Sequence, residues 1–398
     1  MRSLVPLRWV VLGVFVISSA LNYLDRQILA ALAPVIKSEF RLTNADFGLI
    51  LSAFSITYAA AAPLAGLLID RIGLNRGISL SVAVWSLAGV ATGLVKGLGG
   101  LLGCRAALGL AEAAGVPATG KAIVSYLGAA ERAVGHALGQ VGLSVGAMLA
   151  PPVAVWLAMR HGWRSAFLVT GLAGLLWIPL WNRVAGLAPR QESVRGGVGA
   201  REVIRDRRLW GFITANILSM TIYTLWTNWT TIYLVQAHRL TLAETAWLAW
   251  LPPLFANLGG FVGGALSLKW MRGGLPAIPA RMRACLISAL ALLATAAVPW
   301  MPTAGWAVAG ICLSFFWCSA MSVNLYTMPL DIYGAGPAAF AVSMLTSAYG
   351  VMQTVFSPVI GGIIDRYGFE LVCVLFAVLP LAGYLILKES GARSQESE

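Results

Sequence analysis

Four charged residues lie inside apolar stretches of the sequence: Asp25, Arg26, Arg105 and Glu112. Removal from water favours the neutral form of a carboxylic acid, so Asp25 and Glu112 could each take up and release a proton. Arginine presents a planar fork of N–H donors that suits a carboxylate. Two acids and two arginines of this kind could therefore bind an anion and exchange protons at one site.

The spacing of these residues predicts how helices would present them. Arg105 and Glu112 are seven residues apart, about two turns of an α-helix, and so share a face. Tyr23 and Arg26 share a face of an earlier helix. Asp25 points about 100° away from Arg26, which could turn it towards a neighbouring helix while Arg26 faces a cavity. The alternative is a buried ion-pair network that only locks the two helices together.

The composition predicts that membrane helices position these side chains. Of the 398 residues, 59% are hydrophobic and 11% are charged, whereas soluble domains carry about 25% charged residues. The mean hydropathy is +0.79. A bilayer accepts this much apolar surface when the backbone is hydrogen-bonded internally. No period-2 pattern recurs that would indicate a barrel, so we expect an all-α membrane protein.

The hydrophobic pattern predicts twelve transmembrane helices. A helix needs about 20 apolar residues to cross the hydrocarbon core. A polar connection at 184–208 separates six such stretches from six, so we expect two six-helix bundles, 1–183 and 209–398, joined by a cytoplasmic linker. The expected spans are 9–34, 46–69, 77–96, 98–126, 133–159, 163–183, 209–236, 242–269, 280–300, 303–331, 337–364 and 368–387.

The basic residues predict the orientation of the chain. With both termini in the cytoplasm, the cytoplasmic side holds 18 Lys and Arg and the outer side holds seven, in keeping with the positive-inside rule. The net charge of +12 is therefore a topology signal rather than a sign of nucleic-acid binding. The five cysteines lie in apolar runs without metal spacing. We expect no metal, no cofactor and no enzyme activity.

The two halves carry a trace of duplication. Four positions around the end of the fifth expected span recur around the end of the eleventh at a constant offset of 206: Pro152, Arg160, Gly162 and Trp163 match Pro358, Arg366, Gly368 and Phe369. Together with the six-plus-six pattern, this offset predicts a parallel structural repeat.

Residues 66–76 form a motif between the second and third expected spans, with the sequence Gly-Leu-Leu-Ile-Asp-Arg-Ile-Gly-Leu-Asn-Arg. It resembles the G-x-x-x-D-R-x-G-x-x-R signature of the major facilitator superfamily. Gly66 would allow close helix approach and Gly73 a tight turn. Asp70 would lie near a helix N-terminus, with Arg71 and Arg76 facing the cytosol. The alternative is an ordinary charged loop.

Three segments resemble a narrower group, the anion:cation symporter family of that superfamily, and are most similar to its bacterial hexuronate and aldonate importers. Residues 22–26 read Asn-Tyr-Leu-Asp-Arg and resemble its first helix. Residues 104–118 read Cys-Arg-Ala-Ala-Leu-Gly-Leu-Ala-Glu-Ala-Ala-Gly-Val-Pro-Ala and resemble its fourth. Residues 144–152 read Ser-Val-Gly-Ala-Met-Leu-Ala-Pro-Pro and resemble its fifth.

The resemblance implies a role for each candidate residue. Arg26 would contact the substrate carboxylate, and Arg105 would pair with an acid and tune it. Asp25 and Glu112 would take up protons. Contacts to the hydroxylated body of the substrate are implied for Tyr23, Tyr58, Ser314 and Trp317. Ser347 stands where relatives often carry an asparagine, so it or a neighbouring polar residue would take that place.

The function implied by the resemblance is proton-coupled import of small organic anions, with hexuronates or aldonates as the expected substrates. The partners would be the organic anion, protons and the lipid bilayer of the inner membrane, and we expect a monomer. Two alternatives stay open. One is an exporter or drug:proton antiporter of the same superfamily, and the other is a membrane sensor or scaffold that transports nothing.

Overall fold

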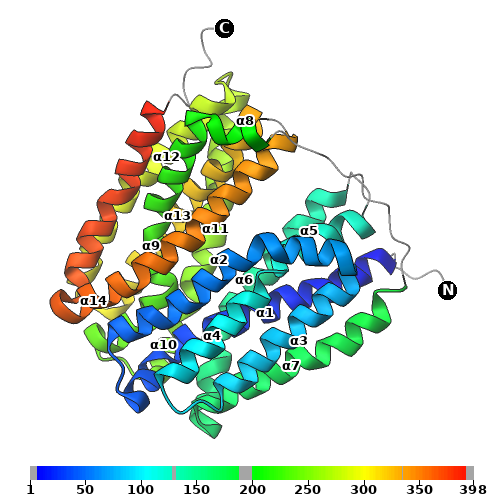
Figure 1. The fold of residues 1–398 in the computed structure, drawn as a ribbon. Helices are drawn as coiled ribbons and strands as arrows, with labels where there is room; N and C mark the ends of the chain where they lie inside the picture. The colour runs from blue at the N-terminus through cyan, green and yellow to red at the C-terminus, as the bar shows by residue number, and fades with distance from the viewer. Residues whose placement is uncertain (1–6, 128–130, 188–199, 334, 391–398) are drawn as a thin grey trace. The chain divides into compact units, whose positions relative to one another are not determined.

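The computed structural model describes residues 7–127, 131–187, 200–333 and 335–390. Every regular element within these ranges is a helix (Figure 1). The chain forms two compact units. The first comprises Met1–Val194 and Thr241–Trp250, and the second Arg195–Leu240 and Leu251–Glu398. The expected linker at 184–208 falls partly outside the described residues, so that assignment stays a prediction.

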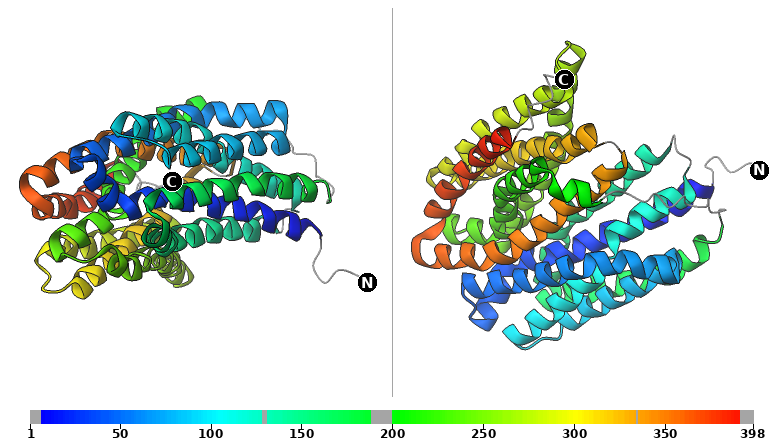
Figure 2. Two further views of the ribbon diagram at one scale, coloured as in Figure 1. Left: turned by 90° about the horizontal axis from the view of Figure 1, so that it is seen from below. Right: turned by 45° about the horizontal axis from the view of Figure 1, so that its top comes forward.

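The first unit contains eight helices: α1 (Leu7–Phe40), α2 (Asn44–Ile72), α3 (Leu74–Thr92), α4 (Leu98–Glu112), α5 (Gly115–Tyr126), α6 (Arg132–His161), α7 (Trp163–Val184) and α10 (Leu242–Ala249). Helix α1 packs along α6 and α7, α2 along α4, and α3 along α4 and α7 (Figures 1 and 2). The core between them combines many alanines with several aromatic residues, and the rings of Trp177 and Trp181 stack at 5.4 Å.

The expected fourth span is divided into two helices directly after Glu112. Pro117 lacks the N–H that would bond to the carbonyl of Ala113, four residues earlier. The amide of Ala114 bonds instead to the carbonyl of Ala111 at 3.4 Å. The same carbonyl accepts a hydrogen bond from the Ser81 hydroxyl of α3 at 2.5 Å. The carboxylate of Glu112 is therefore presented from the end of α4, beside a gap in the regular helix.

The second unit contains α8 (Ala200–Arg205), α9 (Arg207–His238), α11 (Leu251–Arg272), α12 (Ala277–Leu292), the 3₁₀-helix η2 (Leu293–Trp300), α13 (Ala304–Tyr333) and α14 (Ala335–Glu389). Helix α9 packs along α14, and α13 packs along both α11 and α12. The buried side chains between these helices are mainly leucine, methionine and alanine. Helix α14 is interrupted at Gly368, whose backbone is not helical.

The turns that carry the duplicated positions have the same backbone conformation in the two units. Gly162 lies between α6 and α7 with a φ of 80°, and Gly368 has a φ of 76°. Glycine adopts such angles without the steric penalty of a Cβ atom. The common conformation supports the predicted structural repeat.

A second duplicated segment was not recognised in the sequence. Residues 41–46 and 239–244 read Arg-Leu-Thr-Asn-Ala-Asp and Arg-Leu-Thr-Leu-Ala-Glu, at an offset of 198. Arg41 and Arg239 both have a positive φ, of 53° and 55°. In both segments the threonine and the following acid form a reciprocal capping box at the start of the next helix. The sequence pattern that could have revealed this duplication is a helix-capping motif directly after an apolar span.

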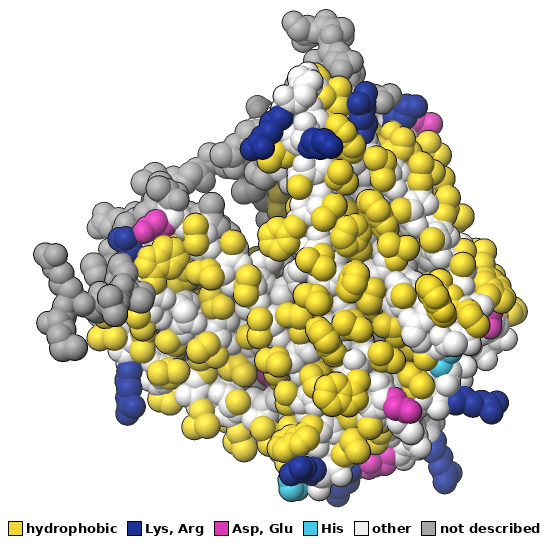
Figure 3. Space-filling view, turned by 180° about the vertical axis from the view of Figure 1, so that it is seen from behind, with side chains coloured by type: hydrophobic (Ala, Val, Ile, Leu, Met, Phe, Trp, Pro, Cys, Tyr) yellow, Lys and Arg dark blue, Asp and Glu magenta, His cyan; other side chains and the backbone are white. Residues whose placement is uncertain are grey.

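Ten segments of the described chain are long and apolar enough to cross a membrane. Helix α14 is counted as one of these ten segments although Gly368 interrupts it, and α9 is not among the ten. Hydrophobic side chains cover most of the face shown in Figure 3, and most Lys and Arg side chains in that view lie towards its margins. These features fit a multi-pass membrane protein. Twelve crossings and cytoplasmic termini stay predictions.

Candidate functional site

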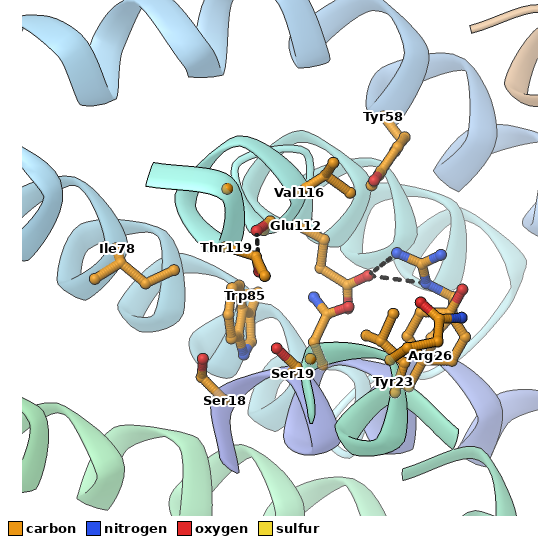
Figure 4. A pocket seen from close by; sticks show the side chains of 16 residues that line it. Ser18, Ser19, Tyr23, Arg26, Tyr58, Ile78, Trp85, Glu112, Val116 and Thr119 are labelled. Carbon is orange, nitrogen blue, oxygen red and sulfur yellow. Dashed lines mark hydrogen bonds and ion pairs between the residues drawn. The ribbon is translucent and has the colours of Figure 1, made fainter. Parts of the chain in front are cut away.

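A cavity of about 330 Å³ lies within the first unit (Figure 4). Its walls come from α1 to α6, and four of the residues singled out from the sequence line it: Tyr23, Arg26, Tyr58 and Glu112. The size falls within the range of about 300–1,000 Å³ that is usual for small-molecule sites. Helices far apart in the sequence thus bring an arginine, an acid and two tyrosines around one space.

Arg26 and Glu112 form an ion pair across α1 and α4, in which Glu112 is buried and Arg26 is half-buried. The Nε and Nη2 atoms of Arg26 donate to a single oxygen, Oε2 of Glu112, at 3.0 and 2.7 Å. The other oxygen, Oε1, accepts no hydrogen bond of normal geometry from the described residues, although the amide of Asn22 is its neighbour. The guanidinium that could bind an external carboxylate is therefore occupied by a carboxylate of the protein itself.

Three aromatic rings surround the Arg26 guanidinium. Its central carbon lies 4.9 Å from the ring centre of Tyr23, 4.7 Å from that of Phe54 and 5.2 Å from that of Tyr58. Such cation–π contacts contribute about 0.5–2 kcal/mol each. Phe54 was missed in the sequence because an apolar residue in an apolar span attracts no attention. The signal was its position four residues before Tyr58, on the same face of α2.

Asp25 and Arg105 lie beside the ion pair but outside the cavity lining. The carboxylate of Asp25 is buried, and neither of its oxygens makes a hydrogen bond of normal geometry with the described residues. Thr170 of α7 and Arg105 are among its polar neighbours. Arg105 donates from Nη1 to the carbonyl of Arg26 at 3.4 Å. Within the described structure, the ion pair with Glu112 is made by Arg26 rather than Arg105.

The charges of this cluster constrain its chemistry. When Asp25, Arg26, Arg105 and Glu112 are all ionised, their charges cancel. An external anion on Arg26 would leave Glu112 without its partner, and breaking a buried ion pair in this way costs about 3–5 kcal/mol. Uptake of a proton by the displaced carboxylate removes that penalty. The arrangement can therefore link the binding of an anion to the binding of a proton.

The residues predicted in the second half lie in the second unit, and none of them lines this cavity. The hydroxyl of Ser314 in α13 is buried and bonds to Thr295 and to the carbonyl of Gly310, both at 2.9 Å. Trp317 is half-buried, with its ring edge-on to Phe316. Ser347 is a half-buried residue of α14.

The loop motif at 66–76 connects α2 to α3. Gly73 ends one helix and begins the next with a φ of 84°, which explains the glycine. At Gly66, an added Cβ would lie 3.8 Å from that of Pro117, so α2 and α5 approach each other there. Arg71 and Arg76 are exposed. The side chain of Asp70 lies outside the described part of the structure.

Apolar helices of spanning length, with charges buried among them, are the features of a multi-pass α-helical membrane protein. The profile of the Major Facilitator Superfamily matches residues 15–343. The chain belongs to that superfamily.

Its relatives include transporters of sugar acids. The hexuronate transporter of Escherichia coli K12 is 28% identical over 408 residues, which cover 97% of this chain and 94% of the relative. The galacturonate transporter of Dickeya chrysanthemi is 32% identical over 286 residues, which cover 67% and 83%. A bacterial homologue of the human lysosomal transporter Spinster, solved in an inward-facing and occupied conformation, has the same fold, with a TM-score of 0.77, 21% identity and coverage of 96% and 97%.

Proposed function

We propose that this protein imports small organic anions together with protons, and that hexuronates or aldonates are its substrates. The observation that carries the proposal is the Arg26–Glu112 pair inside a cavity of ligand size. The relatives named as hexuronate and galacturonate transporters support the substrate class.

Substrate binding begins with protonation of Glu112. The neutral acid holds Arg26 less strongly, and the substrate carboxylate takes its place on the guanidinium. The rings of Tyr23, Phe54 and Tyr58 keep the guanidinium in position during this exchange. The hydroxyls of the two tyrosines are then available to the hydroxylated body of the substrate. The proton and the substrate anion together add no net charge to the site. The desolvation free energy of closing the cavity is therefore lower.

Asp25 and Arg105 form the second part of the coupling machinery. Asp25 takes up a proton as Glu112 does, and Arg105 sits close enough to both acids to stabilise whichever is ionised. In the second unit we assign substrate contacts to Trp317 and Ser347, and a weaker one to Ser314, whose hydroxyl already has two partners. Rocking of the two repeats would then expose the site to each side of the membrane in turn.

The topology that we propose has twelve spans with both termini in the cytoplasm. The ten apolar segments support it, since α14 is interrupted at Gly368 and α9, with 32 residues, is long enough to cross. The excess of basic residues on one side gives the orientation. The bacterial relatives support a location in the inner membrane.

Uptake into proteoliposomes tests the proposal. Vesicles with an alkaline interior are expected to accumulate labelled galacturonate or galactonate above the external concentration, and a protonophore is expected to abolish the accumulation. A neutral hexose and a lipophilic cation serve as controls. Accumulation that survives the protonophore would contradict proton coupling. Cation-driven alkalinisation would indicate a drug antiporter instead, and sugar-acid binding without flux would indicate a sensor.

A further inference from the structure

We propose that the part of the cavity lined by Ser18, Ser19, Trp85 and Thr119 is a hydrated proton-exchange lobe that serves the Oε1 atom of Glu112, the oxygen that Arg26 does not contact. The inference rests on the proposed function and deepens it. It assigns proton transfer and anion binding to two different sides of one carboxylate, and it brings the peripheral helix α3 into the transport mechanism.

Polar atoms at this cavity favour a hydrogen-bonding occupant. The Nε1 of Trp85 is buried without a partner among the described residues, and the Oε1 of Glu112 has the Asn22 amide as its neighbour without a hydrogen bond of normal geometry. All three side chains line the same cavity. Buried polar groups are almost always hydrogen-bonded, to protein or to ordered water. A volume of about 330 Å³ accommodates several waters, each of which fills about 30 Å³ in the liquid.

The two oxygens of Glu112 have different surroundings. Oε2 accepts both hydrogen bonds from Arg26, whereas Oε1 accepts none of normal geometry from the described residues. In Figure 4 the Arg26 guanidinium lies to one side of Glu112, and Trp85, Ile78 and Ser18 lie to the other. A proton on Oε1 can therefore leave through the lobe without crossing the side that Arg26 occupies. Its departure leaves Glu112 ionised, and the ion pair with Arg26 forms again.

The lobe extends towards the same end of each helix that lines it. Ser18 and Ser19 precede Arg26 in α1. Thr119 follows Glu112 along the fourth span, which runs in the opposite direction to the first in the proposed topology. Ser18, Ser19 and Thr119 therefore all lie on the cytoplasmic side of the ion pair in the proposed topology. The lobe is then the route by which a proton carried inward on Glu112 leaves towards the cytoplasm.

The walls of the lobe introduce no competing charge. Helices α3, α5 and α6 contribute only neutral described side chains to the cavity. The charged and titratable groups around Glu112 come from α1, α2 and α4, and they are Tyr23, Asp25, Arg26, Tyr58 and Arg105. A substitution that displaces water from the lobe therefore changes access to Glu112 without removing any of these charges.

Gly120 offers a way to fill the lobe. It lines the cavity, and a Cβ added there meets no atom within 4 Å. In Gly120→Leu we expect proton-driven sugar-acid uptake to fall by about tenfold or more, because the loss of a positioned proton-transfer group slows proton transfer by at least this much. Sugar-acid affinity, measured by equilibrium binding, and exchange across vesicles without a gradient are expected to stay unchanged. The matched control is Gly103→Leu on α4, an exposed glycine with equally open space.

Trp85→Phe provides a second variant, because it removes the unpartnered N–H, together with part of the indole, and keeps an aromatic ring in the core. It is expected to slow proton-driven uptake while leaving affinity unchanged. Equal proton-driven uptake by Gly120→Leu and the Gly103→Leu control would overturn the inference. A loss of sugar-acid affinity in Gly120→Leu that matches its loss of uptake would also overturn it, because the lobe would then be a substrate subsite. Absence of proton-driven uptake in the unsubstituted protein would instead refute the proposed function itself.

Discussion

The buried polar side chains of the two units differ in charge. Asp25, Arg105 and Glu112 are buried in the first unit, whereas the buried polar side chains in the described part of the second are all neutral. In the second unit, Asn216 donates to the carbonyl of Leu345 and Asn324 to that of Gly263. These amides tie helices together. Both units contain buried polar atoms without a hydrogen bond of normal geometry, but in the first unit these include the oxygens of Asp25 and one oxygen of Glu112, whereas in the second they include only neutral groups such as the Oδ1 atoms of Asn216 and Asn324.

Under the proposed function, this difference would mean that the two units divide the work of transport. Opposite charges placed in one cluster neutralise each other, which a bilayer protein needs because an isolated buried charge is costly. Charge exchange would then take place in the first unit, while the second supplies neutral contacts and moves against it. We therefore expect the largest loss of sugar-acid transport from substitutions of the charged residues. Substitutions of the aromatic rings around Arg26 should have a smaller effect, and substitutions of neutral contacts in the second unit the smallest.

The largest expected effect is that of Arg26→Lys. Lysine keeps the positive charge but lacks the planar fork and its stacking against three rings. Sugar-acid affinity, measured by equilibrium titration, is expected to fall by about 100-fold, in keeping with the 2–5 kcal/mol that a buried charged contact contributes. The control is Arg164→Lys, because Arg164 pairs with Glu39 outside the cavity. Equal affinities for the two variants would contradict the role of Arg26.

An intermediate effect is expected for Phe54→Leu. The substitution removes one of the three rings around Arg26 and should weaken sugar-acid binding about fivefold, given the usual size of a cation–π contact. Phe167→Leu is the control, because Phe167 is also buried and packs against Trp163 in α7. A thermal-shift assay reports the stability that both lose. If binding falls equally in both variants, the ring of Phe54 is a packing element only.

The smallest effect is expected in the second unit. Ser347→Ala removes one neutral hydroxyl, and its KM for the sugar acid should rise only about threefold, because a neutral hydrogen bond contributes about 0.5–1.5 kcal/mol. Uptake kinetics measured beside Arg26→Lys give the comparison directly. A loss as large as that of Arg26→Lys would show that the second unit carries as much of the binding energy as the first.

The sequence was most informative where a residue type conflicts with its surroundings. Charges inside apolar spans identified Arg26 and Glu112, and the structure places them in one ion pair. The helical stretches followed from hydrophobicity and length alone. The break between α4 and α5 was not predicted: Pro117 removes one backbone hydrogen bond there, and the hydroxyl of Ser81, thirty residues away along the chain, bonds to the carbonyl of Ala111. Phe54 was missed because an aromatic residue in an apolar span conflicts with nothing.

Pairing between the charges was harder to predict than their presence. Periodicity put Arg105 and Glu112 on one face of a helix, yet the guanidinium that reaches Glu112 comes from Arg26 on α1. Which of two arginines meets a carboxylate depends on the separation and rotation of α1 and α4, and helical spacing does not determine either.

Transport by Glu112→Gln tests the central claim most directly. Glutamine keeps the size and hydrogen-bonding capacity of the side chain but takes up no proton. In proteoliposomes, this variant is expected to lose sugar-acid accumulation driven by a proton gradient and to retain exchange of labelled for unlabelled substrate. Glu39→Gln, outside the cavity, is expected to accumulate substrate normally. Concentrative uptake by Glu112→Gln equal to that of the unsubstituted protein would contradict the account.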